Sequence, residues 1–157
     1  MIHIRKAQKS DCTEIVKLVS ELAEYEKLAN EAQATPELIE QALFEENPKV
    51  FCEIAEYDGQ VAGMALYFYN FSTFIGRHGL YLEDLFVRPA LRGKGIGKQL
   101  LVKLAQIAKE NNCGRMEWSV LDWNEPAINF YLSLNAKPMD EWTVYRLDQT
   151  AIAELAK

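Results

Sequence analysis

The stretch that decides the fold is Arg92-Gly93-Lys94-Gly95-Ile96-Gly97-Lys98, which lies between a strand-like apolar run and a helix-like one. Alternate glycines let a backbone approach a bulky anion closely, and the N–H groups at the start of a helix bind phosphate oxygens. Arg92, Lys94 and Lys98 add positive charge. The stretch therefore predicts a phosphate-binding loop, with a basic turn that binds no ligand as the alternative.

Two common phosphate loops do not fit this spacing. A Walker A loop requires Ser or Thr after Gly-Lys, whereas Gln99 follows Gly97-Lys98. The dinucleotide-binding pattern GxGxxG fails because the three glycines of the stretch have the spacing GxGxG. Nucleotide hydrolysis and dinucleotide binding are both disfavoured.

The segments around the loop alternate between strand and helix patterns. Residues 80–87 form an apolar strand interrupted by Glu83 and Asp84, and the glycines lead into a helix that ends near Asn112. Before this strand we expect a strand over 2–5, a helix over 11–26 capped by Ser10, a second helix that starts after Thr35 and ends by Asn47-Pro48, and strands over 50–57 and 60–70 joined by an Asp58-Gly59 turn. After the loop and its helix we expect a strand over 115–121, a helix over 125–134, a strand over 143–147 and a short C-terminal helix. The pattern indicates one mixed α/β domain over residues 1–157.

Length and composition bound the class of protein. The chain has 157 residues, of which 49% are hydrophobic, enough for one domain with its own core. No apolar run approaches the roughly 20 residues of a membrane-spanning helix, and the first residues lack a signal-peptide pattern, so we expect no membrane partner. Three scattered cysteines indicate a reduced, cytoplasmic protein, and with only two histidines we expect no metal site.

Charge is unevenly distributed along the chain, whose formal net charge is −6. The acidic region, residues 11–46, holds ten acids and two bases, whereas the basic region, residues 88–109, holds six bases and no acid. The net acidity argues against a nucleic-acid partner. The two regions suit a protein that holds a cation and an anion at the same time.

Four motifs in order resemble the GNAT acetyltransferases. The RxxGxG pattern at 92–97 is similar to the acetyl-CoA pyrophosphate loop of that family, and residues 80–87, 123–131 and 21–27 resemble its spermidine/spermine (diamine) acetyltransferase branch. The resemblance covers nearly the whole chain. It implies the GNAT fold, a twisted mixed β-sheet flanked by helices and splayed between its fourth and fifth strands.

The resemblance also implies acetyl-CoA as the cosubstrate. Its pantetheine arm would pair, as if it were another strand, with the backbone of Leu85, Phe86 and Val87. Its pyrophosphate would be held by Arg92, Gly93, Lys94, Gly95, Ile96, Gly97 and Lys98. Further contacts to the cosubstrate would come from Asn124, Glu125, Pro126, Ala127 and Tyr131.

Attack of an amine on a thioester sets two chemical demands. An alkylamine of pKa near 10.4 must lose a proton, which at pH 7 costs about 4–5 kcal/mol, and the departing thiolate benefits from protonation. We expect Glu83 to be the base, directly or through a water, because a carboxylate in an apolar strand has a raised pKa. A structural ion pair, or an anchor for the substrate cation, is the alternative for Glu83, and we expect Asp84 to be structural. From spacing alone Tyr131 is a core tyrosine, whereas the resemblance implies that it protonates the sulfur.

The substrate implied by the resemblance is a small cationic amine. Tyr25 and Glu26 match positions that line the amine site of the resembled branch, and Glu83 would be a third contact. The sequence departs from polyamine enzymes at 140–146, where Trp142 and Thr143 take the places of a Gly-Trp pair that follows an acid. A shorter amino acid such as thialysine or lysine, or a related diamine, is therefore a credible substrate beside a polyamine.

We expect the reaction to be a direct transfer in a ternary complex, because none of the cysteines lies in a nucleophile motif. The alternatives are a protein lysine or N-terminal acetyltransferase, and a CoA-binding regulatory module without turnover. The resemblance further implies a homodimer with its sites near the interface.

Overall fold

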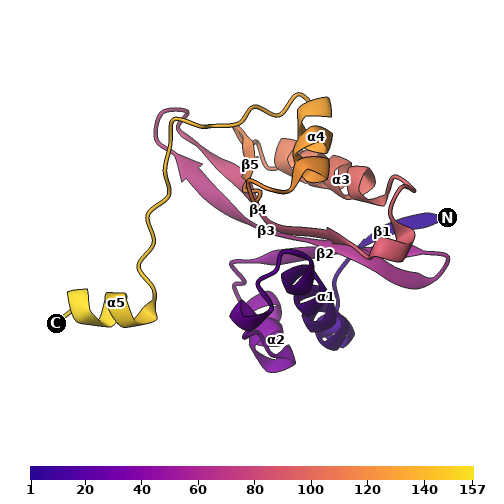
Figure 1. The fold of residues 1–157 in the computed structure, drawn as a ribbon, viewed down its shortest axis with the longest axis horizontal. Helices are drawn as coiled ribbons and strands as arrows, with labels where there is room; N and C mark the ends of the chain where they lie inside the picture. Colours follow the sequence, from indigo (N-terminus) through magenta and orange to yellow (C-terminus); the bar gives the residue numbers. More distant parts are fainter. The chain divides into compact units, whose positions relative to one another are not determined.

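The computed structural model describes residues 1–157 and divides them into two compact units, Met1–Ser119 and Val120–Lys157. The first unit is built on a five-stranded sheet, shown in Figure 1. In the order in which they lie in the sheet, its strands are β1 (Ile2–Lys6), β2 (Phe51–Tyr57), β3 (Gln60–Ser72), β4 (Arg77–Val87) and β5 (Met116–Trp118). The first four pair antiparallel and β5 pairs parallel to β4, so the predicted mixed α/β class is confirmed.

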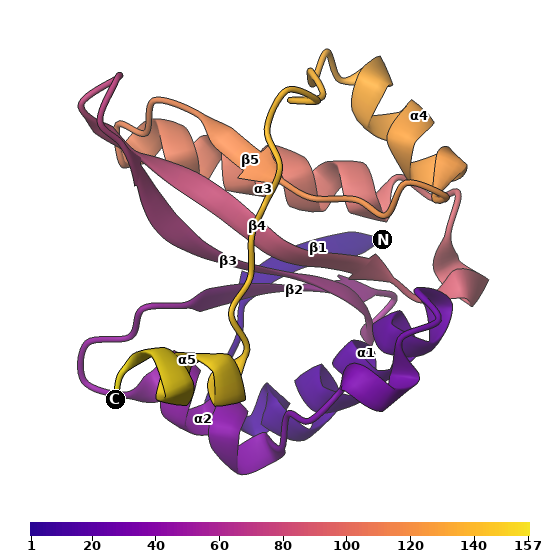
Figure 2. The ribbon, with the colours of Figure 1, turned by 60° about the vertical axis from the view of Figure 1, so that its left-hand side comes forward.

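Helices cover both faces of this sheet. Figures 1 and 2 show α1 (Cys12–Tyr25) and α2 (Pro36–Phe44) on one face and α3 (Ile96–Glu110) on the other. Three short 3-10 helices complete the unit: η1 (Lys9–Asp11), η2 (Ala29–Glu31) and η3 (Pro89–Leu91). None of the helices has both the length and the apolar character to cross a membrane.

The core lies on both faces of the sheet. Toward α1 and α2, the buried side chains of Ile15, Leu18 and Leu43 pack against the sheet residues Ile54, Met64 and Phe86. On the opposite face, α3 packs over β3 and β4, and the side chains of Leu100 and Leu104 are fully buried on consecutive turns of that helix. This packing on the two faces holds α1 and α3 against β4.

Local signals correctly placed the start of α2 and the turn between β2 and β3. The Thr35 hydroxyl accepts a hydrogen bond from the Leu38 amide at 3.2 Å, which begins α2 as predicted. Asp58 and Gly59 have φ angles of 49° and 83°, which confirms the hairpin turn between β2 and β3.

Two predicted boundaries were wrong. Ser10 does not cap the first helix, because the chain enters α1 through η1, where a capping box joins Gln8 and Asp11. The predicted strand over 115–121 is only three residues long, since the ladder between β4 and β5 stops at the Leu82–Trp118 pair.

The second unit contains α4 (Glu125–Ser133) and α5 (Gln149–Leu155) and no strand. Asn124 and Asp148 begin the two helices by accepting hydrogen bonds from Ala127 and Ala151. The predicted strand over 143–147 is therefore wrong: β-branched and aromatic residues favour a strand only where another strand pairs with them, and this unit offers none.

Candidate active site

The site is organised by a β-bulge in β4. Along the pairing with β3, Asp84 lies opposite Leu66 and Leu82 lies opposite Tyr67, so Glu83 has no residue opposite it. On the other side of β4, the parallel pairing with β5 ends at Leu82. Beyond the bulge, β4 therefore continues to Val87 with strand partners on the β3 side only, as Figure 2 allows the reader to follow.

Along β4, the backbone N–H and C=O groups of successive residues point alternately toward β3 and toward this open edge. The Arg88 amide donates to the Ala62 carbonyl at 2.8 Å, so the backbone groups of even-numbered residues here point toward β3. Those of Leu85 and Val87 point toward the open edge. Phe86 belongs to the other group, since its backbone faces β3 and its ring is buried in the core. Of the three residues expected to pair with pantetheine, Leu85 and Val87 thus have their backbone groups on this edge, where the Val87 carbonyl accepts from Arg92 Nε.

The glycine-rich loop joins this strand to α3. Gly93 and Gly95 have φ angles of 81° and 84°, in the left-handed region that glycine adopts without strain, and Gly95 is the residue from which α3 starts. The space where a side chain would stand at either glycine is open. The first amides of α3 have no partner within the helix, so the loop fits a bulky anion such as a pyrophosphate.

The basic side chains of the loop lie against aromatic rings. Arg92 donates from Nε to the Val87 carbonyl at 2.9 Å, and its guanidinium lies 4.5 Å from the centre of the Tyr25 ring. The Lys94 ammonium lies 5.2 Å from the centre of the Tyr57 ring, and the Lys98 side chain is exposed. The structure thus brings Arg92, expected at the phosphate, together with Tyr25, expected at the amine.

Carboxylates gather at the bulge and at the end of α1. Burial, and after it the charges of Glu83 and Glu26, raise the pKa of Asp84 to about 6. Burial also raises the pKa of Glu26, which ends α1 next to Tyr25. The Glu83 side chain is exposed. The carboxyl that the strand partly buries is therefore Asp84, which sequence reasoning had set aside as structural.

The residues expected from the second unit lie on α4 or directly before it. Asn124 is buried, and its side chain accepts from the Ala127 amide at 3.4 Å. Glu125 and Pro126 form the first turn of the helix, where proline needs no amide partner. Tyr131 is partly buried, with its ring 5.7 Å from the ring of Phe130.

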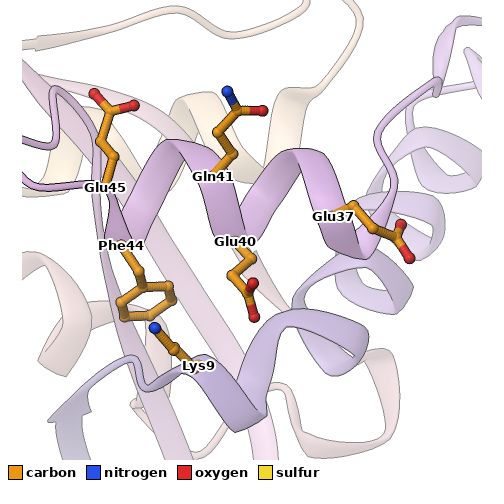
Figure 3. A pocket seen from close by; sticks show the side chains of 6 residues that line it. All are labelled: Lys9, Glu37, Glu40, Gln41, Phe44 and Glu45. Carbon is orange, nitrogen blue, oxygen red and sulfur yellow. The ribbon is translucent and has the colours of Figure 1, made fainter.

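A hollow on α2 does not involve any of these residues. Figure 3 shows its lining, with Glu37 and Glu40 on α2, Glu45 directly after the helix, and the Lys9 ammonium directed toward the Phe44 ring. Most of the lining belongs to the acidic region. We assign no part of the active site to it.

Sequence reasoning also missed Arg88, which follows β4 directly. Its side chain donates hydrogen bonds to Glu14 and Glu21 on α1 and to the Val61 carbonyl. The available signal was the seven-residue spacing of the two glutamates, which places them two turns apart on one face of the helix. Their partner lies more than sixty positions away in the chain, and a local pattern does not reveal it.

An open strand edge that runs into a glycine-rich loop at the start of a helix is the arrangement expected of a transferase that binds an acyl-CoA. Residues 12–135 match the acetyltransferase (GNAT) family, and the chain belongs to it. It is an acetyl-CoA-dependent N-acetyltransferase with the GNAT fold, as the resemblance implied.

Three relatives illustrate the range of similarity. The thialysine N-epsilon-acetyltransferase of Mus musculus is 38% identical over 98% of this chain and 96% of its own length. The spermidine/spermine N(1)-acetyltransferase-like protein 1 of Homo sapiens is 33% identical over 98% of this chain and 23% of its own length. Among solved structures, an integron cassette protein of V. cholerae superposes with a TM-score of 0.83 at 32% identity, covering 99% of this chain and 98% of that one.

Proposed function

We propose that this enzyme transfers the acetyl group of acetyl-CoA to a primary amine of a small cationic substrate, either a polyamine or diamine or a thialysine-like amino acid. The amine nitrogen attacks the thioester carbonyl, the C–S bond breaks, and CoA leaves as the thiol. The two substrates react within one ternary complex. No acetyl group is carried by the enzyme.

The observation that carries this proposal is the carboxylate cluster beside the open edge of β4. The thioester of a cosubstrate paired along Leu85 and Val87 would lie next to the bulge, where Glu83 and Asp84 stand. Glu26 is close enough for its charge to raise the pKa of Asp84. A cationic amine would relieve the repulsion among these carboxylates, so the site favours a protonated amine over a neutral or acidic acceptor.

The same carboxylates supply a base. The amine must lose a proton before it attacks, and a carboxylate within reach, directly or through one water, accepts it. We assign this role to Glu83, whose place in the bulge leaves its side chain exposed for a substrate. Asp84, with a pKa of about 6, is ionised at neutral pH and holds the cation next to it.

Tyr131 is our candidate acid. A phenol can donate its proton to the departing sulfur and regain one from solvent after CoA leaves. The position of Tyr131 on α4, in the helix that Asn124 caps, matches the motif that carries this role in the resembled branch. Glu125, Pro126 and Ala127 in the first turn of that helix would contact the cosubstrate.

The relatives support a small acceptor over a protein. The mouse relative is named for thialysine and an Arabidopsis thaliana relative, 43% identical over 64% of this chain, for L-ornithine. Both names describe amino acids with a terminal amine. A protein lysine or N-terminal acetyltransferase, and a CoA-binding module without turnover, remain the competing functions.

The test is a thiol-release assay with acetyl-CoA and a panel of acceptors: spermidine, spermine, a diamine, thialysine, lysine, ornithine and a lysine-containing peptide. Thermal stabilisation by CoA alone is measured in parallel. We expect thiol release with at least one small cationic amine and little with the peptide. Stabilisation by CoA without thiol release would support the binding module, and a preference for the peptide would overturn the small-amine assignment.

Three further features belong to the proposal. We propose that residues 1–157 act as one domain, because the match to the family continues across the boundary between the two compact units. We propose a homodimer, on the resemblance to the diamine acetyltransferase branch. The three free cysteines support a reducing, cytoplasmic location.

A further inference from the structure

Arg88 connects the end of β4, the strand expected to pair with acetyl-CoA, to α1. The end of that helix carries Tyr25 and Glu26, the residues expected to bind the acceptor amine. From Nη2 it donates to a Glu14 oxygen at 2.6 Å and to a Glu21 oxygen at 3.0 Å. From Nε it reaches both Glu21 oxygens, at 3.2 and 3.3 Å, and from Nη1 the Val61 carbonyl at 3.0 Å. One guanidinium therefore connects β4, β3 and two turns of α1.

The side chain and the backbone of Arg88 have separate tasks. Its amide pairs with the Ala62 carbonyl at 2.8 Å, so the end of β4 stays attached to β3 whatever the side chain does. The loop that follows is held by the Arg92 bond to Val87. Loss of the Arg88 side chain would therefore remove the ion pairs between α1 and the end of β4, while the packed core still holds the helix on the sheet and the glycine-rich loop stays attached.

The part of α1 that Arg88 holds lies one turn before the acceptor residues. Glu21 precedes Tyr25 by four positions and Glu26 by five, and all three side chains are partly buried. The Arg92 guanidinium over the Tyr25 ring makes a second link between the loop and the end of this helix. The place of Glu26 relative to the Asp84 carboxyl thus depends on how α1 is tied to β4.

We propose that Arg88 is a positioning residue for the acceptor amine: by pairing with Glu14 and Glu21 it sets the end of α1, which carries Tyr25 and Glu26, against the end of β4. The guanidinium suits this task because its planar fork bonds two carboxylates and a carbonyl at once. The role of Tyr25 and Glu26 in acceptor binding rests on the proposed function. The link itself rests on the contacts alone.

The chain offers a matched control in Arg5. Its side chain is 24% exposed, against 25% for Arg88, and it too pairs with two carboxylates, those of Asp11 and Glu56. Arg5 lies on β1, at the opposite edge of the sheet from β5. Arg5→Gln thus removes a comparable set of ion pairs without touching the connection between β4 and α1.

The experiment compares Arg88→Gln, Glu21→Gln and Arg5→Gln with the unmodified enzyme. We expect the KM of the amine to rise about tenfold in the first two, with the Kd of acetyl-CoA changed less than about twofold. In the double variant Arg88→Gln/Glu21→Gln, the rise in the amine KM should be smaller than the product of the two single rises, because both changes break the same contact. Arg5→Gln should lower thermal stability and leave the amine KM unchanged. An unchanged amine KM in both Arg88→Gln and Glu21→Gln, or an equal rise in Arg5→Gln, would overturn the proposal.

Amide hydrogen exchange tests the link without any activity. We expect faster exchange for residues 21–26 in Arg88→Gln than in Arg5→Gln, with residues 96–110 unchanged in both. Unchanged exchange over 21–26 would overturn the proposal even if the enzyme is active. Faster exchange in a protein that transfers acetyl to no amine would sustain the link and reject the proposed function instead.

Discussion

Asp84→Asn tests the electrostatics of the site through protein stability. The pKa of Asp84 stands at about 6, against an ordinary value of 3.8, and burial is the largest cause. A difference of about two pKa units corresponds to about 3 kcal/mol. Asparagine has nearly the same volume and no charge, so it removes this electrostatic cost with little change in packing.

The direction of the stability change follows from which state of the protein binds the Asp84 proton more tightly. Because the folded state binds the Asp84 proton more tightly than the unfolded state does, the contribution of this group to stability is fully present below pH 3.8 and is lost as the pH rises through 6. Asp84→Asn should therefore be more stable than the unmodified protein at pH 7.5, by up to about 3 kcal/mol. The advantage should shrink steadily as the pH is lowered toward 5.

Urea unfolding between pH 5 and 8 measures this difference. Asp140→Asn, at an exposed position of the second unit, removes the same charge and reports the effect of net charge alone. A stability difference for Asp84→Asn that does not vary with pH, or a variant less stable at every pH, would refute the account of Asp84. A saturating amine should also stabilise the unmodified protein more than the variant, because it compensates the buried charge.

Four other changes probe separate parts of the site. Tyr131→Phe should reduce kcat by about a hundredfold with unchanged stabilisation by CoA, and an unchanged kcat in steady-state assays would remove Tyr131 as the acid. Glu83→Gln should alter the acidic limb of the pH–rate profile, and a superimposable limb would exclude Glu83 as the base. Gly95→Ala places a side chain at a φ of 84° and should cost about 1–2 kcal/mol in urea unfolding and weaken CoA binding, whereas equal affinity in titration calorimetry would argue against the loop geometry. Rising salt should increase the KM of spermine more than that of a monoamine, and equal salt dependence would limit the acidic region to an ordinary solvated surface.

Elements with local signals were predictable from the sequence. The cap at Thr35, the turn at Asp58-Gly59 and the glycine-rich loop each depend on a few neighbouring residues, and the structure has all three. The strand predicted over 143–147 failed for the opposite reason, since a strand exists only through pairing with a distant segment. Local propensity at those residues carried no information about a partner.

The roles of Glu83 and Asp84 could not be separated by sequence. Strand alternation places neighbouring side chains on opposite faces, but which of these two becomes buried depends on where the bulge interrupts the register with β3. A shift of one residue would have exchanged them. Arg88 was hidden for a similar reason, because its partners on α1 are brought to it only by the packing of the helix on the sheet.

The most direct test of the central claim is product analysis by mass spectrometry after incubation of the enzyme with acetyl-CoA and either thialysine or spermidine. We expect an amine that gains one acetyl group on a primary nitrogen, an equal amount of free CoA, and an enzyme of unchanged mass. Acetylated enzyme with no acetylated amine, or CoA bound without any acetylated product, would contradict it.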